Sequence, residues 1–327
     1  MRTPCLAHSR RCKTNVVTIG LDPHPDSHTV AALDENGTTL ASLTVSNDTA
    51  GLARLHEFAG SFPRYRWAIE GAANRFILPF VSALIAHGET IHHIPPNLTS
   101  QYRTRLGRKK NDVVDASNAA RALLANPELP VFHPGAGQRE FQDLTRTQRR
   151  LSEQLKANRM ALQALDPGSS ARSALTQVIH VLEEQLAELS EQMKKLVKTL
   201  APALLELLGV GPVVASVILG EVGTIERFAN EGQFASYCGA APVERGSGKN
   251  SRMQLNHGGN RRLNWALHII ALTRSRCDER TKTLLAKLKA RGKTQRASLR
   301  ILKTYIAREL FRHLHQTVTP VLNSGST

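Results

Sequence analysis

Four acidic residues stand where their side chains could act together in chemistry. Asp22 directly follows a run of apolar and β-branched residues, and Glu70 ends another such run. Asp112 and Asp115 are three residues apart, so they would share one face of a helix. Carboxylates gathered at one point repel one another and resist ionising, and a divalent cation relieves that repulsion. The pattern therefore predicts a cage of carboxylates for metal ions.

Such a cage supports the transfer of phosphodiester bonds. Mg²⁺ prefers hard oxygen ligands and keeps several of its waters, and Mn²⁺ is the alternative ion. Two ions can activate an attacking oxygen and stabilise a leaving one. Taken singly, each acid has an ordinary explanation as a turn cap, a surface residue or a helix N-cap. The coincidence of all four with the ends of predicted elements favours a catalytic role. Asp34 is a fifth candidate, but it borders a predicted turn, so we interpret it as a residue that stabilises the turn.

The elements that would position these acids follow from the spacing of apolar residues. Five strands are predicted, at residues 15–21, 28–34, 38–45, 64–70 and 90–94. Helices are predicted at residues 47–59, 76–87 and 112–124, with a short one after Pro95-Pro96. This order is that of an RNase H-like domain, in which a meander of three strands precedes two parallel strands. In that fold the strands that end at Asp22 and Glu70 are neighbours. Gly37 is expected to adopt a positive φ in a hairpin turn.

The remainder of the chain is predicted to be helical, so the fold class is α/β plus α. Leucines recur at spacings of three, four and seven residues and are interrupted at 166–170, which predicts an antiparallel coiled-coil hairpin. This hairpin would be a spacer, an arm that assembles subunits, or both. The predicted segments are a disordered basic lead-in at 1–14, the RNase H-like domain at 15–136, the coiled-coil arm at 137–200, a helical domain at 201–315 and a disordered tail at 316–327.

The composition points to a nucleic-acid partner. The 327 residues carry a net charge of +16, from 43 basic and 27 acidic side chains. Such an excess suits a polyanion, although a generic basic protein is the alternative. The four cysteines contain no Cys-x-x-Cys pair, which argues against a disulfide framework or a zinc site. We find no signal peptide and no run of about 18 apolar residues. We therefore expect a cytoplasmic, nucleoid-associated protein with no membrane partner.

Three features predict where nucleic acid would bind. One basic cluster precedes Asp112, and another lies in a glycine-rich loop of the helical domain, whose later helices add further cations up to Lys303. Gly209 and Gly211 lie between two predicted helices, as in a helix-hairpin-helix, whose backbone N–H groups hold a phosphate. A pair of helix-capping glycines is the alternative. The clusters comprise Arg103, Arg105, Arg108, Lys109 and Lys110, and then Arg245, Lys249, Arg252, Arg261 and Arg262.

Ser247 lies between Gly246 and Gly248 in the second basic cluster and is a candidate nucleophile. A serine flanked by glycines is accessible enough to attack an electrophile. By chemistry alone the signal is weak, because most such serines are ordinary loop residues. Ser251 is the nearest competitor, and no histidine has an obvious claim as the general base.

Three stretches of the sequence resemble the DEDD-type insertion-sequence transposases, which are bridge-RNA-guided recombinases. The resemblance covers roughly residues 15–315. The stretches are Ile19-Gly20-Leu21-Asp22, then Lys110-Asn111-Asp112-Val113-Val114-Asp115-Ala116, and a C-terminal signature of Tyr237-Cys238-Gly239-Ala240-Ala241-Pro242, Ser247-Gly248 and Gly259-Asn260-Arg261-Arg262-Leu263. After Asp22 the chain departs from the family, with Pro-His-Pro-Asp where a Val-Ser-Lys-like stretch is usual.

The resemblance implies an RNase H-like domain, a coiled-coil arm and a C-terminal transposase domain. It implies that the four acids bind Mg²⁺ and that Ser247 attacks DNA and holds it covalently. It further implies a noncoding bridge RNA that pairs with donor and target DNA, and a dimer that assembles into a tetramer. Two other hypotheses stay open. One is a resolvase-like, structure-specific nuclease that does not use Ser247, and the other is a nucleic-acid-binding protein without catalytic activity.

Overall fold

The computed structural model describes residues 16–106, 111–245, 252–254, 256 and 258–318. The chain divides into two compact units, which we call unit 1 (Met1–His133) and unit 2 (Pro134–Thr327). Among the described residues, no helix is both long enough and apolar enough to cross a membrane.

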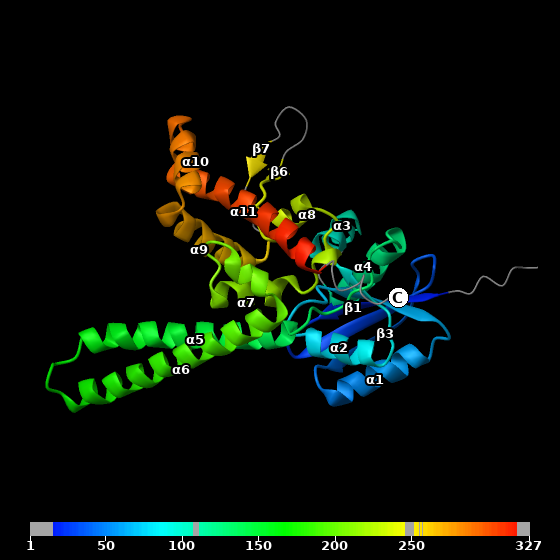
Figure 1. The fold of residues 1–327 in the computed structure, drawn as a ribbon. Coiled ribbons are helices and arrows are strands. Elements are labelled where there is room, and N and C mark those ends of the chain that lie inside the picture. The colour runs from blue at the N-terminus through cyan, green and yellow to red at the C-terminus, as the bar shows by residue number, and fades with distance from the viewer. Residues whose placement is uncertain (1–15, 107–110, 246–251, 255, 257, 319–327) are drawn as a thin grey trace, which may run out of the picture. The chain divides into compact units, whose positions relative to one another are not determined.

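Unit 1 is built on a mixed sheet of five strands in the order β3-β2-β1-β4-β5. The first three strands form an antiparallel meander, and β4 and β5 then extend the sheet in parallel with β1. The five predicted strands and their chain order are confirmed (Figure 1). The strands are β1 (Val17–Pro23), β2 (Ser27–Leu33), β3 (Thr39–Ser46), β4 (Tyr65–Glu70) and β5 (Ile91–Ile94).

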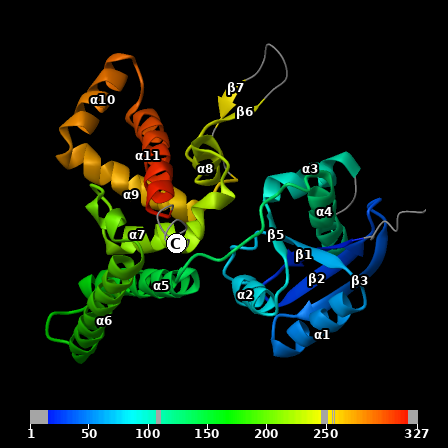
Figure 2. The same ribbon diagram turned by 45° about the vertical axis from the view of Figure 1, so that its right-hand side comes forward.

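Four helices cover the two faces of this sheet (Figure 2). They are α1 (Thr49–Gly60), α2 (Leu78–Ala86), α3 (Pro96–Leu106) and α4 (Asp112–Ala125). Helices α1 and α2 pack on one face, where Leu55 and Leu84 share a core with Leu21 and Ile69. Helices α3 and α4 pack on the other face. Because side chains alternate along a strand, each strand contributes to both cores.

Helix α4 crosses β1 at very short range, and Gly20 makes this crossing possible. A Cβ atom at position 20 would lie 1.9 Å from the backbone oxygen of Ala116. Only a residue without a side chain fits under the helix at this point. The facing turns of α4 are also small, since Ala116, Ala119 and Ala120 are fully buried there. The sequence therefore fixes α4, and the acids at its start, directly over the central strand.

The hairpin turn between β2 and β3 has the predicted chemistry. Gly37 has a φ of 80°, and the Asp34 carboxylate accepts hydrogen bonds from the backbone N–H groups of Asn36 and Thr38 at 3.0 and 2.8 Å. The turn role predicted for Asp34 is thus confirmed, and this acid lies apart from the four candidates at the ends of other elements.

Unit 2 begins with a long helical hairpin. Helices α5 (Gln138–Gln163) and α6 (Ser170–Leu200) run antiparallel and pack against each other (Figure 1). The turn lies close to the predicted interruption at 166–170. Arg172 closes it by donating two hydrogen bonds of 2.9 Å, one to the carbonyl oxygen of Leu162 and one to that of Leu165.

The helical body of unit 2 packs around one core that includes Ile218, Phe234, Ile270 and Ile306. Its elements are η1 (Pro202–Glu206), α7 (Pro212–Val222), η2 (Ile225–Arg227), α8 (Glu231–Tyr237), β6 (Val243–Arg245), β7 (Arg252–Gln254), α9 (Arg261–Cys277), α10 (Glu279–Ala290) and α11 (Gln295–Val318). The β6–β7 ribbon lies where a loop was predicted. The sequence did not indicate it, because strands of three residues are too short to show a recognisable alternation of apolar and polar residues. Helix α11 runs three residues past the predicted domain end at 315.

Candidate metal centre and basic surfaces

Strands β1 and β4 bring Asp22 and Glu70 to the same end and the same face of the sheet. The parallel register pairs Leu21 with Ile69, so the two acids follow at adjacent positions. Gly20 lies under α4, and Ala68 packs in the core that α4 forms on this face. Since side chains two residues apart point to the same face, Asp22 and Glu70 project toward the α4 side.

The first turn of α4 supplies the other two acids. Asn111 caps the helix, and its side chain accepts a hydrogen bond of 3.0 Å from the Val113 N–H. Asp112 and Asp115 follow in the first turn, where the partial positive charge of a helix N-terminus stabilises carboxylates. Asp115 is buried, with 2% of its surface exposed, whereas the Asp112 side chain is 53% exposed. Asp115 therefore faces the sheet and Asp112 lies at the rim.

The electrostatics of Asp22 reflect this gathering of acids. Burial raises the pKa of the Asp22 carboxyl, and the nearby carboxylates of Asp115 and Asp112 raise this pKa further. His24 acts in the opposite direction. The structure thus brings the carboxylates of Asp112 and Asp115 close enough to raise the pKa of Asp22, and the strand register places Glu70 beside Asp22.

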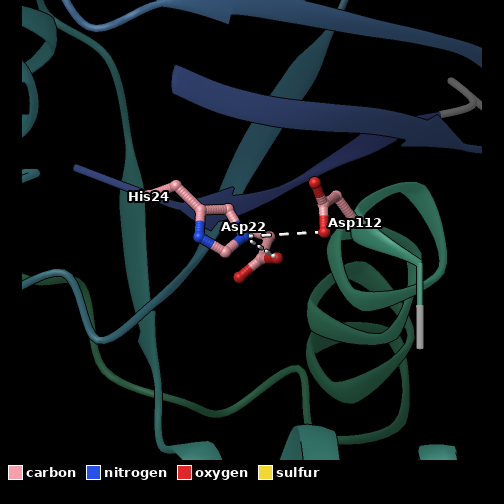
Figure 3. A group of neighbouring side chains, drawn as sticks. All are labelled: Asp22, His24 and Asp112. Atoms are coloured by element: carbon pink, nitrogen blue, oxygen red, sulfur yellow. Dashed lines mark ion pairs between the residues drawn. The ribbon is translucent and has the colours of Figure 1, made fainter. Parts of the chain in front are cut away.

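His24 also belongs to this cluster, although the sequence patterns did not predict it. Its Nε2 lies 3.3 Å from Asp22 Oδ2 and 3.6 Å from Asp112 Oδ1 (Figure 3). One potential ligand atom from each of these three residues lies within 4.8 Å of the others. The only signal in the sequence was the unusual Pro-His-Pro-Asp stretch after Asp22, which carries no periodicity.

The residues present fit a divalent cation. The cluster offers carboxylate oxygens from two elements and one imidazole nitrogen, which are ordinary ligands for such ions. The raised pKa of Asp22 means that its negative charge is disfavoured in this environment, and a bound cation would remove that penalty. The site can therefore hold the type of ion that its acids predict.

Several predicted nucleic-acid residues and the candidate nucleophile lie outside the described residues. These are Ser247, Arg108, Lys109, Lys110 and Lys249. Arg103 and Arg105 lie on α3, at the end of the chain segment that precedes α4. Arg245 and Arg252 pair across the β6–β7 ribbon. This ribbon therefore brackets the stretch of sequence that contains Ser247.

The adjacent residues Arg261 and Arg262 differ in environment. Arg262 Nε lies 3.1 Å from Glu221 Oε1, and its Nη2 donates a hydrogen bond of 2.5 Å to the Thr145 hydroxyl. These contacts join α9 to α7 and α5, so Arg262 has a structural task inside unit 2. Arg261 is exposed and lines two cavities. The two arginines form one basic patch in the sequence, but in the structure Arg262 is ion-paired and partly buried whereas Arg261 is exposed.

One of these cavities is basic and has a volume of about 570 Å³. Its cationic lining comprises Arg261, Lys293, Arg300 and Lys303, from α9, α11 and the loop that precedes α11. Lys303 Nζ donates a hydrogen bond of 2.7 Å to Asn264 Oδ1. Burial lowers the pKa of Lys303, and the nearby Arg300 lowers it further. A bound anion would therefore stabilise the charged form of Lys303. No sequence pattern distinguishes Arg300 and Lys303 from the other cations of these helices.

The glycines of the predicted helix-hairpin-helix have separate explanations. Gly209 has a φ of 87°, and a Cβ there would lie 3.3 Å from the backbone of Ile270, so this glycine is required by the turn and by packing. Gly211 is the N-cap of α7, and nothing lies within 4 Å of its Cβ position. The preceding element is the short 3₁₀ helix η1 in place of an α-helix. The backbone near Gly211 is therefore the open part of this motif.

Two family models match the chain. The model described as "Transposase IS116/IS110/IS902 family" matches residues 201–286, and a DEDD transposase model of the IS110 type matches residues 19–167. The uncharacterised 44.8 kDa protein of insertion element IS116 from Streptomyces clavuligerus is 24% identical over 338 residues, covering 79% of this chain and 84% of that protein. The uncharacterised 43.6 kDa protein of insertion element IS110 from Streptomyces coelicolor is 29% identical over 222 residues, covering 62% of this chain and 53% of that protein.

Proposed function

This chain belongs to the IS110/IS116/IS902 family of transposases, and from that premise we propose that it cuts and rejoins DNA with metal ions held by Asp22, Glu70, Asp112 and Asp115. The observation that carries this proposal is the convergence of the end of β1 with the first turn of α4. All four acids lie within the part of the chain that the DEDD transposase model matches.

The chain's own residues hold and orient the reactants. The pairing of β1 with β2 and β4 fixes the position of Asp22, and Asp115 is buried against the sheet. Asp112 lies at the rim and its side chain is 53% exposed, so DNA could approach the cluster from this side. Mg²⁺, or Mn²⁺ in its place, would polarise the scissile phosphate and stabilise the leaving oxygen when bound. Because the acids lie on rigid elements, the site needs little reorganisation to receive the ions.

The proposal extends to Ser247, which lies outside the described residues. Its Oγ would attack the phosphorus and form a phosphoserine ester, and the displaced deoxyribose hydroxyl would take up the proton that the serine loses. Attack by the hydroxyl of another strand would then reverse the step and release the serine. This role is supported by the match of residues 201–286 to the transposase family and by the resemblance around Ser247.

Replacement of Ser247 by alanine is expected to abolish the covalent protein–DNA adduct and strand exchange. The measurement would use the full chain, Mg²⁺, donor and target DNA, and RNA transcribed from the flanking element, resolved on denaturing gels. Ser251→Ala is the matched control, because it removes the nearest competing hydroxyl. Only the wild type and Ser251→Ala should form the adduct.

The alternative function is a resolvase-like nuclease that uses the same acids for hydrolysis. It would cleave DNA without an adduct, and Ser247→Ala would cleave as well as the wild type. That result would remove Ser247 from the mechanism while leaving the metal centre in place. An adduct that formed without RNA would support Ser247 as the nucleophile but argue against a reaction guided by a bridge RNA.

The proposed partners are donor and target DNA, a bridge RNA and further copies of the chain. The strand order of unit 1 supports an RNase H-like domain at 15–136. The α5–α6 hairpin supports a coiled-coil arm at 137–200, on which Met160 and Val181 are 64% and 55% exposed. Such exposed apolar side chains suit assembly into a dimer and then a tetramer. The remaining proposals are the transposase domain at 201–315 and a cytoplasmic, nucleoid-associated location.

The basic cavity of unit 2 is proposed to hold a phosphate of the nucleic-acid backbone. Arg261→Ala and Arg300→Ala are each expected to weaken DNA binding and to reduce the slope of log K against log salt by about one unit. Arg280→Ala is the matched control, because this exposed arginine on α10 lies outside the cavity lining. Fluorescence anisotropy with duplex DNA at several salt concentrations would give the slopes.

Equal effects of all three substitutions would mean that only net charge matters and would remove the cavity from the proposal. Thermal unfolding of each variant would check that unit 2 remains folded. Arg262 is unsuitable for this test, because its pairing with Glu221 makes loss of stability the expected result.

A further inference from the structure

We propose that His24 is a nitrogen ligand of the metal centre and that it raises the affinity of this chain for Mn²⁺ relative to Mg²⁺. The inference rests on the proposed metal centre of Asp22, Glu70, Asp112 and Asp115. It goes beyond that centre by adding a ligand of a different chemical type.

The distances suit a shared ion. Atoms bound to one ion at about 2.1 Å are separated by about 3.0 Å when adjacent and about 4.2 Å when opposite. The Nε2 of His24 lies 3.3 Å from Asp22 Oδ2 and 3.6 Å from Asp112 Oδ1, within the range between these values. Figure 3 shows the imidazole directed toward both carboxylates. The three side chains can therefore become ligands of one ion through small adjustments.

The turn that carries His24 is held in place on both sides. Its backbone N–H donates a hydrogen bond of 3.0 Å to the carbonyl oxygen of Ser27. The Asn47 side chain donates one of 2.9 Å to the carbonyl oxygen of Pro25, and the Asn47 N–H donates one of 3.0 Å to that of Asp26. Pro23 and Pro25 also restrict the backbone on either side of His24. The imidazole is thus presented at the end of β1 by a preorganised turn.

The environment of His24 Nε2 also suits a ligand. The side chain as a whole is 39% exposed, but the Nε2 atom is buried and has no hydrogen-bond partner among the described residues. The simpler explanation is an ion pair, in which a protonated His24 balances the charges of Asp22 and Asp112. That explanation accounts for the same distances, but it predicts no bond between nitrogen and metal. The two interpretations therefore differ in a property that can be measured.

The chemistry of imidazole determines the expected selectivity. Mg²⁺ strongly favours oxygen ligands, whereas Mn²⁺ also prefers oxygen but, as a transition ion, accepts an imidazole nitrogen more readily than Mg²⁺ does. A carboxylate site to which His24 adds a nitrogen ligand should gain affinity for Mn²⁺ and gain little for Mg²⁺. Replacement of His24 by alanine should therefore lower Mn²⁺ affinity by roughly 10- to 100-fold, as loss of a metal-supporting group commonly does, and should change Mg²⁺ affinity much less.

Pulsed electron paramagnetic resonance of Mn²⁺ bound to the untagged full chain tests this proposal without reference to activity. The wild type is expected to show modulation from a directly bound ¹⁴N nucleus, and His24→Ala is expected to lose it while still binding Mn²⁺. His180→Ala is the matched control, since this histidine is exposed on α6, and it should retain the signal. Asp22→Asn should lose Mn²⁺ binding at this site.

The outcomes separate the two proposals. Mn²⁺ that binds through Asp22 but shows no ¹⁴N modulation, or modulation that survives in His24→Ala, would overturn the role of His24 and leave the carboxylate centre intact. Mn²⁺ binding that is unaffected by Asp22→Asn would overturn the proposed metal centre itself.

Discussion

Asp22→Asn is expected to lower the rate of DNA strand cleavage by a factor on the order of 10³. The substitution keeps the size of the side chain and removes one negative ligand, and metal catalysis contributes several kcal/mol of transition-state stabilisation. The pairing of β1 with β2 fixes the backbone of Asp22, and the first turn of α4 supplies the neighbouring acids Asp112 and Asp115. A substitution at Asp22 therefore affects the centre of the proposed metal site.

This loss should occur without unfolding. Burial raises the pKa of Asp22, so the folded chain without metal holds this negative charge at a cost. Removal of the charge should leave the melting temperature of the metal-free protein unchanged or slightly higher. Added Mg²⁺ or Mn²⁺ should stabilise the wild type more than the variant, because an ion that binds only the folded state raises its stability.

Cleavage assays and thermal unfolding with and without metal would measure both effects. Asp34→Asn is the matched control, because it makes the same change in unit 1 at the β2–β3 turn, where asparagine can also accept the turn hydrogen bonds. Wild-type cleavage by Asp22→Asn would rule out the proposed metal centre. A large fall in the metal-free melting temperature would instead make Asp22 a structural residue.

The sequence predicted the positions of the acids because each depends on a simple periodicity. Asp22 and Glu70 were placed by the ends of two apolar runs that the chain order makes parallel neighbours. Asp112 and Asp115 were placed by a spacing of three residues on a helix. These predictions need only local patterns and one topological rule, the parallel pairing of β1 and β4. The structure therefore places the acids where the patterns predict them.

His24 could not be found in this way. Its approach to Asp112 depends on the turn that Asn47 holds and on the docking of α4 over Gly20, and neither feature has a periodic signal. The neighbouring arginines Arg261 and Arg262 present the same difficulty. Both add positive charge to the same stretch of sequence. The ion-pair partner of Arg262, however, is Glu221, which lies on α7 and is far away in the sequence. Which cation is free to bind a ligand is a property of packing.

Gly20→Ala is expected to disrupt the metal centre although position 20 has no side chain in it. The new Cβ would lie 1.9 Å from the backbone oxygen of Ala116 and 2.8 Å from the backbone nitrogen of Ala120. Neither atom can rotate away, so α4 must move off the sheet. Overpacking of this kind costs about 1–3 kcal/mol, and backbone contacts on two turns place this case at the upper end. Asp112 and Asp115 would move with the helix.

Thermal unfolding and Mn²⁺ titration would test this coupling between packing and the site. The melting transition of unit 1 should fall by roughly 4 °C for each kcal/mol lost, and Mn²⁺ affinity should fall as well. Gly60→Ala is the matched control, because it adds the same methyl group at the end of α1 with nothing within 4 Å, and it should leave both quantities nearly unchanged. A Gly20→Ala protein with wild-type stability would contradict the close crossing of α4 over β1. One that loses stability but keeps full Mn²⁺ affinity would show that ion binding does not depend on the position of α4, and the roles of Asp112 and Asp115 as ligands would then be excluded.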